Sequence, residues 1–245
     1  MSENKNIVSQ NKRTLSVHKE HELLLKLEAA GLDDKLAQKV IDSKGNELAA
    51  KMMRLIQGDG SELFATPYHS LIFRQDFWQR HGVDADFTGL VIPAKKTGFD
   101  RLLVIPQGLT INKAITLCRK KFDVWAYVDN LDRDVNKNDR IAGKTYAIWV
   151  RDRAEADKEL KNLSANDLKK IYINGITLLE RLVYELKYFD ETNQHLDIKY
   201  ITLCSGSRRS DGCVPGVRWH DGKLDVLWYY SGSADGYLRS RAAVS

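Results

Sequence analysis

The sequence predicts an α+β fold in which helices carry a small sheet whose short strands are joined by long loops. Two patterns lead to this prediction. Amphipathic helical segments fill the first part of the chain and recur after its middle, while short apolar or alternating runs lie between them and dominate the C-terminal part. A chain of 245 residues with 43% hydrophobic and 29% charged residues also has the composition of a folded protein with a proper core.

Residues 1–60 are expected to form a helical N-terminal region. Apolar residues interleaved with Lys and Glu predict one amphipathic helix that ends at Gly31. A pair of aspartates can cap a second helix over residues 36–41, and a third helical pattern over residues 48–56 runs into a Gly-rich break. This region can dock on the main domain, dimerise or attach the protein to a larger assembly, and the sequence does not choose among these.

Residues 61–245 form the main predicted domain. Apolar runs at residues 89–92 and 102–105 predict two strands, each followed by a proline. Residues 122–128 alternate as a third strand. Between them lies a helix with Thr110 as its N-cap and a buried stripe made of Ile111, Ala114, Ile115 and Cys118.

The second half of this domain is expected to alternate between helices and strands. Ser164, with Asp167 three residues on, predicts a capped helix. Two other helices are expected, a short polar one at residues 153–160 and a strongly amphipathic one at residues 176–189. Three further strands are expected, at residues 146–150, 201–204 and 238–244.

The stretch from Cys213 to Arg241 reads as a binding surface rather than an active site. On a pleated strand, side chains at alternate positions point to the same face. The apolar residues expected on the face toward the core are Val217, Trp219, Leu224, Val226, Trp228 and Leu238. The residues between them face the other way: Gly216, Arg218, His220, Asp225, Leu227 and Tyr229. A loop rich in Tyr, Ser, Gly and Asp follows at residues 230–237, and such a composition is typical of paratopes. The alternative is a Gly/Ser-rich hairpin with ordinary turn chemistry.

No motif in the sequence points to an enzyme or a metal centre. It has no phosphate loop, no Gly-x-Gly-x-x-Gly after a strand, no His-Glu-x-x-His and no Gly-x-Ser-x-Gly elbow. Cys213, His220 and Asp221 are a nucleophile, base and orienting group by type only, because nothing in the sequence brings them together. A charged loop with four aspartates lacks the Gly and the terminal Glu of a calcium site. Arg239 and Arg241 share one face of a strand and are expected to fix loops by bidentate bonds to carboxylates.

Charge and cysteine content narrow the class of protein further. The formal net charge of +5 is modest and is not concentrated in one run, so it allows contact with nucleic acid without requiring it. The apolar runs are too short to span a bilayer and the N-terminus lacks the pattern of a secretory signal, so a cytoplasmic location is the default expectation. Surface or virion display stays open. The three cysteines show no metal-ligand spacing, and Cys118 and Cys204 are expected to be small buried hydrophobes.

Several segments resemble the variable proteins of diversity-generating retroelements, in particular those of uncultivated archaea and small-genome bacteria. The resemblance covers residues 97–245, and its most specific part is Leu-Arg-Ser-Arg at residues 238–241 after the aromatic, Ser/Gly/Asp-rich run. The other segments that carry it are Tyr146 to Arg153, Gly175 to Leu182, Leu203 to Arg208, Cys213 to Pro215 and Trp228-Tyr229.

The resemblance implies a C-type-lectin-like fold whose variable region, about residues 205–241, is rewritten by adenine-directed mutagenesis during reverse transcription of a template repeat. In this family, Asn codons of the template become codons that can specify Tyr, Ser, Gly, Asp, His, Arg or Leu, but never Trp, Met, Lys, Glu or Gln. Trp219 and Trp228 are then scaffold, and Lys223 does not fit this code. The positions that can vary and contact ligand are Arg209, Gly216, Arg218, His220, Asp221, Asp225, Leu227, Tyr230, Ser231, Asp235, Gly236 and Tyr237.

The implied function is binding of an unspecified ligand, expected to be a protein, with no catalysis, cofactor or required metal. Two other classes are kept as alternatives. One is an enzyme on the same fold, similar to formylglycine-generating oxidases and using Cys213 or Cys204. The other, less favoured, is a basic nucleic-acid-binding protein, whose binding would fall steeply as salt rises. The sequence does not predict the oligomeric state.

Overall fold

The chain divides into two compact units, Met1–Thr66 and Pro67–Ser245. The structure is a computed structural model that describes residues 16–29, 32–42 and 75–245. No helix within those ranges combines the length and the apolar character that crossing a bilayer requires.

In the first unit, the first two predicted helices are present as α1 (Val17–Ala29) and α2 (Asp34–Ile41). Asp33 is the N-cap of α2, since its carboxylate accepts a hydrogen bond from the backbone N–H of Leu36 at 2.7 Å. The helix expected at residues 48–56 lies outside the described residues.

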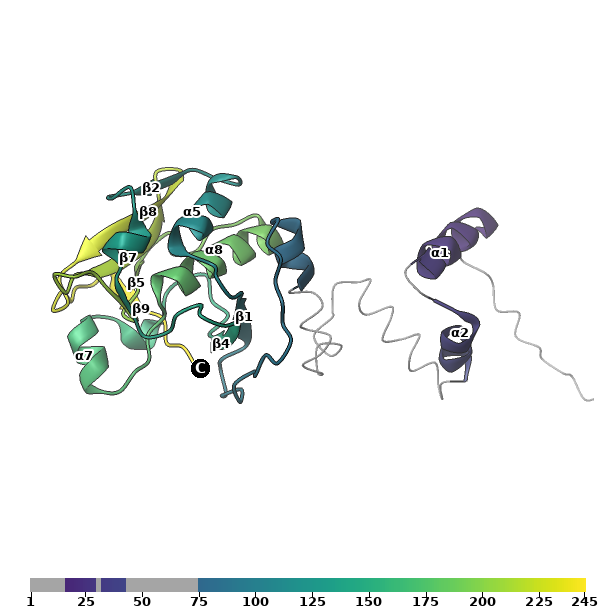
Figure 1. The fold of residues 1–245 in the computed structure, drawn as a ribbon, viewed down its shortest axis with the longest axis horizontal. Coiled ribbons are helices and arrows are strands. Elements are labelled where there is room, and N and C mark those ends of the chain that lie inside the picture. Colours follow the sequence, from purple (N-terminus) through teal and green to yellow (C-terminus); the bar gives the residue numbers. More distant parts are fainter. Residues whose placement is uncertain (1–15, 30–31, 43–74) are drawn as a thin grey trace, which may run out of the picture. The chain divides into compact units, whose positions relative to one another are not determined.

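The second unit begins, in its described part, with a helical segment at residues 75–80. The elements that follow in chain order (Figure 1) are β1 (Arg101–Ile105), α5 (Ile111–Arg119), β2 (Val124–Ala126), α6 (Leu131–Asp134), β3 (Lys137–Asn138), β4 (Tyr146–Val150), η3 (Lys158–Leu160), α7 (Ala165–Lys170), α8 (Leu178–Thr192), β5 (Ile201–Leu203), β6 (Ser207–Arg208), β7 (Val214–His220), β8 (Lys223–Tyr229) and β9 (Leu238–Ser240).

A mixed five-stranded sheet organises this unit. Its strand order is β2-β8-β7-β5-β9; β2 runs parallel to β8 and β9 parallel to β5, whereas the other neighbours are antiparallel. Two small antiparallel pairs, β1 with β4 and β3 with β6, accompany it. The α+β class predicted from the sequence is therefore confirmed.

The hairpin of β7 and β8 forms the centre of this sheet. Its register runs from Val214 opposite Tyr229 to His220 opposite Lys223. Asp221 and Gly222 make the connection with φ angles of 50° and 74°. A two-residue loop with both φ angles positive matches the right-handed twist of the strands, and Asp-Gly is a favoured pair for it.

The inner face of the sheet packs against α5 and α8 (Figure 1). Both helices begin at a threonine cap: Thr110 accepts from the N–H of Lys113, and Thr177 forms a capping box with Glu180. The cap and the stripe predicted for α5 are confirmed, whereas α8 begins two residues later and ends three residues later than its amphipathic pattern predicts. The shared core is made of residues from both helices and from the sheet, including Ile115, Leu182, Val217, Leu224 and Val226.

Among the described residues of this unit, a helix covers one end of the opposite, outer face. There Ala165, the first residue of α7, packs with Leu203, Val214 and the half-buried Tyr229. The capping box predicted at the start of α7 is present. The end of the outer face that belongs to β2 and β8 carries exposed side chains, and it is the part considered below as a candidate site.

Several other predicted elements differ from the structure. The strand expected at residues 122–128 is limited to β2. Residues 89–92 form no strand, because Gly89 turns the chain at φ +70° and the following apolar residues pack irregularly on β1 and β4. Residues 153–160 are helical only in η3, since the carbonyls of Arg153 and Ala154 accept hydrogen bonds from Arg241 instead of from a helix. The last strand ends at Ser240 rather than continuing to residue 244.

Candidate binding surface

The register of the β7–β8 hairpin separates its residues into two sets. The set on the inner face is Val217, Trp219, Leu224, Val226 and Trp228, of which the three aliphatic residues are fully buried and the two indoles half-buried against the same core. The set on the outer face is Gly216, Arg218, His220, Lys223, Asp225, Leu227 and Tyr229. The predicted alternation of the two faces therefore holds along both strands.

Gly216 was predicted to be a variable contact position, but it is buried. A Cβ atom added there would lie 2.5 Å from Cε2 of Tyr229 and 3.1 Å from Cγ2 of Ile201. Such distances are shorter than carbon–carbon contacts allow. No side chain fits at this position, because neighbouring side chains on the outer face occupy the space. Glycine is therefore required there unless Tyr229 moves.

Asp225 was also predicted to be a contact position, but it is only 5% exposed. It lies between Trp125 and Arg218, its cross-strand neighbours on β2 and β7. Its Oδ2 is 3.6 Å from Nε of Arg218 and 3.9 Å from Nδ1 of the exposed His220, and its Oδ1 makes no hydrogen bond to any described residue. Because a buried carboxylate without a counter-charge is costly, Arg218 and Asp225 are coupled positions rather than independent ones.

The loop at residues 230–237 is exposed at Tyr230 (79%) and Tyr237 (69%). Main-chain atoms hold it: the carbonyl of Ser231 accepts from the N–H of Asn166 at 3.0 Å, and that of Tyr237 accepts from Ile201 at 2.9 Å. One side chain takes part, since Oδ1 of Asp235 accepts from the N–H groups of residues 237 and 238. The loop conformation is therefore mostly independent of the side chains that it presents, and Gly236 is exposed with open space beside it.

The remaining predicted contact residues are His220, Asp221, Leu227 and Arg209. His220 and Asp221 are exposed beside the turn, with 3.3 Å between Nδ1 and Oδ2. Leu227 is half-buried on the outer face. Arg209 pairs with Asp211 at 2.7 Å, and its guanidinium lies 5.2 Å from the ring centre of Trp228. The structure thus brings the outer-face residues and the loop into one region, whereas Arg209 lies against an indole of the inner face.

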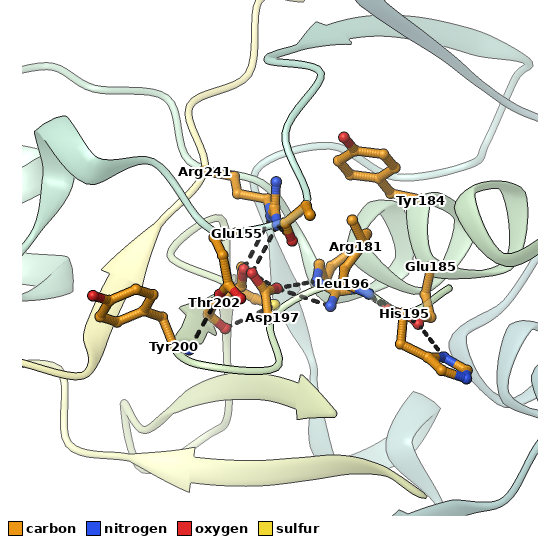
Figure 2. Close-up of polar contacts among 12 residues, drawn as sticks. Glu155, Arg181, Tyr184, Glu185, His195, Leu196, Asp197, Tyr200, Thr202 and Arg241 are labelled. Carbon is orange, nitrogen blue, oxygen red and sulfur yellow. Dashed lines mark hydrogen bonds and ion pairs between the residues drawn. The ribbon is translucent and has the colours of Figure 1, made fainter. Parts of the chain in front are cut away.

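Beneath the sheet lies a buried network of charged residues (Figure 2). Asp197 occupies its centre, fully buried and with a left-handed backbone (φ 57°). Its carboxylate accepts from Nη2 of Arg241 at 2.7 Å and from Nε of Arg181 at 2.9 Å, and the hydroxyl of Thr202 donates to it as well. Burial opposes ionisation of Asp197, but the two guanidinium groups outweigh it and hold the pKa of this carboxyl below its usual value.

This network continues to the inner side of the hairpin. Arg181 bonds Glu185 at 2.8 Å, and Glu185 in turn contacts Nδ1 of His195 at 2.8 Å (Figure 2). The His195 ring stacks on the indole of Trp219, with 3.2 Å between ring centres and 5° between planes. The backbone N–H of Trp219 donates to the carbonyl of Asp197 at 3.1 Å. Trp219 is therefore held both by its ring and by its main chain.

Arg241 and Arg239 use different partners, although one role was predicted for both. Arg241 is buried and reaches the carboxylate of Asp197, but through one nitrogen rather than the two predicted, and its other bonds include two carbonyls of the loop before η3. Arg239 reaches no carboxylate among the described residues. Its guanidinium lies 3.3 Å from the ring centre of Tyr200, and its Nη1 donates to the carbonyl of Ala156 at 3.4 Å.

Asp197, Arg181 and His195 were not named from the sequence. Arg181 and Glu185 are four residues apart on a predicted helix, a spacing that allows an ion pair. The sequence does not indicate that both of these charged side chains are buried. Asp197 follows the helix in an irregular segment, and its partners are distant in sequence. Such a long-range cluster has no local sequence signal.

The three cysteines give a test of the enzyme alternative. Burial raises the pKa of the Cys118 and Cys204 thiols, and partial burial together with Asp211 raises that of Cys213. A nucleophilic cysteine needs a lowered pKa. We therefore expect a disulfide reagent at pH 7 to modify only Cys213 in the folded protein, slowly, and all three thiols in denaturant. Rapid modification of Cys204, or of Cys213 below pH 7, would instead favour a catalytic thiol.

Comparison of the chain with protein-family models, with curated proteins and with solved structures finds no match.

Proposed function

We propose that this chain is a ligand-binding protein with a C-type-lectin-like domain, whose C-terminal surface is diversified by a retroelement. The observation that supports this best is the division of the β7–β8 hairpin. Trp219 and Trp228, which the mutagenesis code cannot produce, face the core, while residues that the code can produce occupy the outer face, apart from Lys223, and the adjoining loop. Two independent criteria, the codon set and the strand register, therefore select nearly the same residues.

The way in which the loop is held also supports diversification. A surface whose residues change must keep its backbone when they do. Apart from the carboxylate of Asp235, residues 230–237 are fixed by carbonyls and N–H groups that any side chain leaves in place, and a rigid frame of buried ion pairs lies below the sheet. Changes at Tyr230, Ser231 and Tyr237 would alter what is presented without altering how it is supported.

The structure also narrows the set of positions that should vary. Gly216 has no room for a side chain, and Asp225 needs a partner for its charge. We expect Gly216 to be constant, and Arg218 and Asp225 to change together. Asp235 is expected to vary less, because its carboxylate holds the loop. The freely variable positions are then the others with exposed or half-buried side chains outside this pair: Arg209, His220, Asp221, Leu227, Tyr230, Ser231, Gly236 and Tyr237.

Sequencing the gene's neighbourhood and several sibling copies of the gene tests this function. A template repeat and a reverse-transcriptase gene should lie nearby, and the siblings should differ mainly at the freely variable positions. Substitutions spread evenly along the chain, or concentrated at inner-face residues such as Val217 and Leu224, would contradict the proposal.

A further inference from the structure

The binding face extends beyond the C-terminal segment onto β2. Trp125 is the Cα partner of Asp225 in the parallel pairing of β2 with β8, so both side chains leave the sheet on its outer face. The backbone N–H of Tyr127 donates to the carbonyl of Val226 at 3.3 Å, which continues the ladder past the end of the strand. Tyr127, two residues after Trp125, therefore lies on the same face beside Leu227.

Both aromatic side chains are exposed, Trp125 by 41% and Tyr127 by 67%. Their rings form an edge-to-face pair with 6.0 Å between centres. The residues between them on the strand and before them, Ala126 and Val124, turn inward and pack on the core. Core packing favours a buried tryptophan, but this strand exposes its tryptophan and partly buries its smaller residues. The exposed aromatic pair therefore indicates a partner outside the domain.

We propose that Trp125 and Tyr127 are a fixed aromatic anchor of the binding face, contributed from outside the diversified segment, and that the anchor takes an apolar side chain of a protein partner. The proposal rests on the proposed function, since it assigns constant residues to the same site. Large aromatic side chains at the centre of an interface supply most of its affinity at a low cost in conformational entropy. A constant anchor would allow each new set of variable residues to begin from a shared contact.

The chemistry around the anchor favours a protein over other macromolecules. Next to it the outer face carries both signs of charge, in Arg218, Lys223 and Asp221 with the buried Asp225, so it suits a protein surface of mixed charge. A nucleic acid would meet acidic side chains where its phosphates need basic ones. The two rings stand at 86° to each other and so do not form the coplanar platform on which a sugar chain would stack.

A display library tests the anchor separately from the proposed function. The full chain is diversified at the freely variable positions and selected against purified lysozyme, and Trp125→Ala is then placed in each selected clone. We expect lysozyme binders to emerge, and each to lose at least about ten-fold in affinity without Trp125. Ile141→Ala is the matched control, since Ile141 is exposed and lies outside the five-stranded sheet, and it should leave affinity unchanged. Both variants should keep the melting temperature of their parent clone.

The outcomes separate the two ideas. A library that yields no lysozyme binder would overturn the proposed function, and the anchor with it. Binders that keep their affinity in the Trp125→Ala form would overturn the anchor alone. Clones that bind an immobilised polysaccharide in a parallel selection, and not lysozyme, would replace the protein partner by a carbohydrate and so overturn the stated partner.

Discussion

Replacing Asp197 by alanine is expected to lower the free energy of unfolding by about 3–5 kcal/mol, because Arg241 would be left as a buried charge without a counter-ion and Arg181 would keep only Glu185. Both guanidinium groups are at most 1% exposed as side chains, so water cannot take over the role of the carboxylate. Urea denaturation of the full chain at pH 7, followed by circular dichroism, measures the loss. Asp197→Asn is the second variant if the alanine form does not fold, since it keeps an oxygen acceptor and removes only the charge.

The control for Asp197 is an ion pair of similar distance at the surface. Arg153 and Glu159 are 2.7 Å apart, and their side chains are 38% and 42% exposed. Since water screens such pairs, Glu159→Ala is expected to cost under about 1 kcal/mol. Equal losses in the two variants would mean that the central network does not hold the fold together.

The contribution of the Asp197 carboxylate should also be measurable in the unmodified protein, as a loss of stability at low pH. The pKa of Asp197 lies below its ordinary value of 3.8 in the folded state, so the unfolded chain takes up a proton at higher pH than the folded one does. The stability that its ionised form contributes is present above that ordinary value and is lost as the pH falls through the lower folded value. The unmodified protein should therefore lose stability below about pH 4 more steeply than Asp197→Asn does.

How much of this molecule the sequence predicts depends on how local each signal is. The caps at Thr110, Asp33 and Ser164 and the alternation in the β7–β8 stretch involve residues a few positions apart, and they are present as predicted. The Asp221-Gly222 pair between two alternating strands was a readable hairpin signal that was not used. Local pattern thus predicted these helix starts and the two faces of the hairpin.

What the sequence did not predict depends on contacts between distant segments. The alternation correctly places Gly216 and Asp225 on the outer face, but it does not predict which neighbouring side chains bury them. Tyr229 closes the space at Gly216, and the parallel pairing that places Trp125 opposite Asp225 joins segments about a hundred residues apart. The same pairing gives the binding face the part that was missed in the sequence.

Two tryptophans on opposite faces of one sheet are expected to give opposite results when each is replaced by alanine. Trp219→Ala should lower the free energy of unfolding by about 3 kcal/mol, because the inner indole fills space among Phe122, His195 and the core, and its loss leaves a cavity. Trp125→Ala should lower it by under about 1 kcal/mol, because the outer indole is 41% exposed and belongs to none of the buried clusters of the described residues.

Urea denaturation of the two variants, beside binding measurements on clones selected from the library, decides between the two roles. Trp219→Phe should recover part of the lost stability, since a second aromatic ring can still stack on His195. The outer-face residues can change without loss of the fold only while Trp219 supports the sheet from its inner face. Unchanged stability in Trp219→Ala, or a large loss in Trp125→Ala, would show that the support and the contact surface had been assigned to the wrong faces.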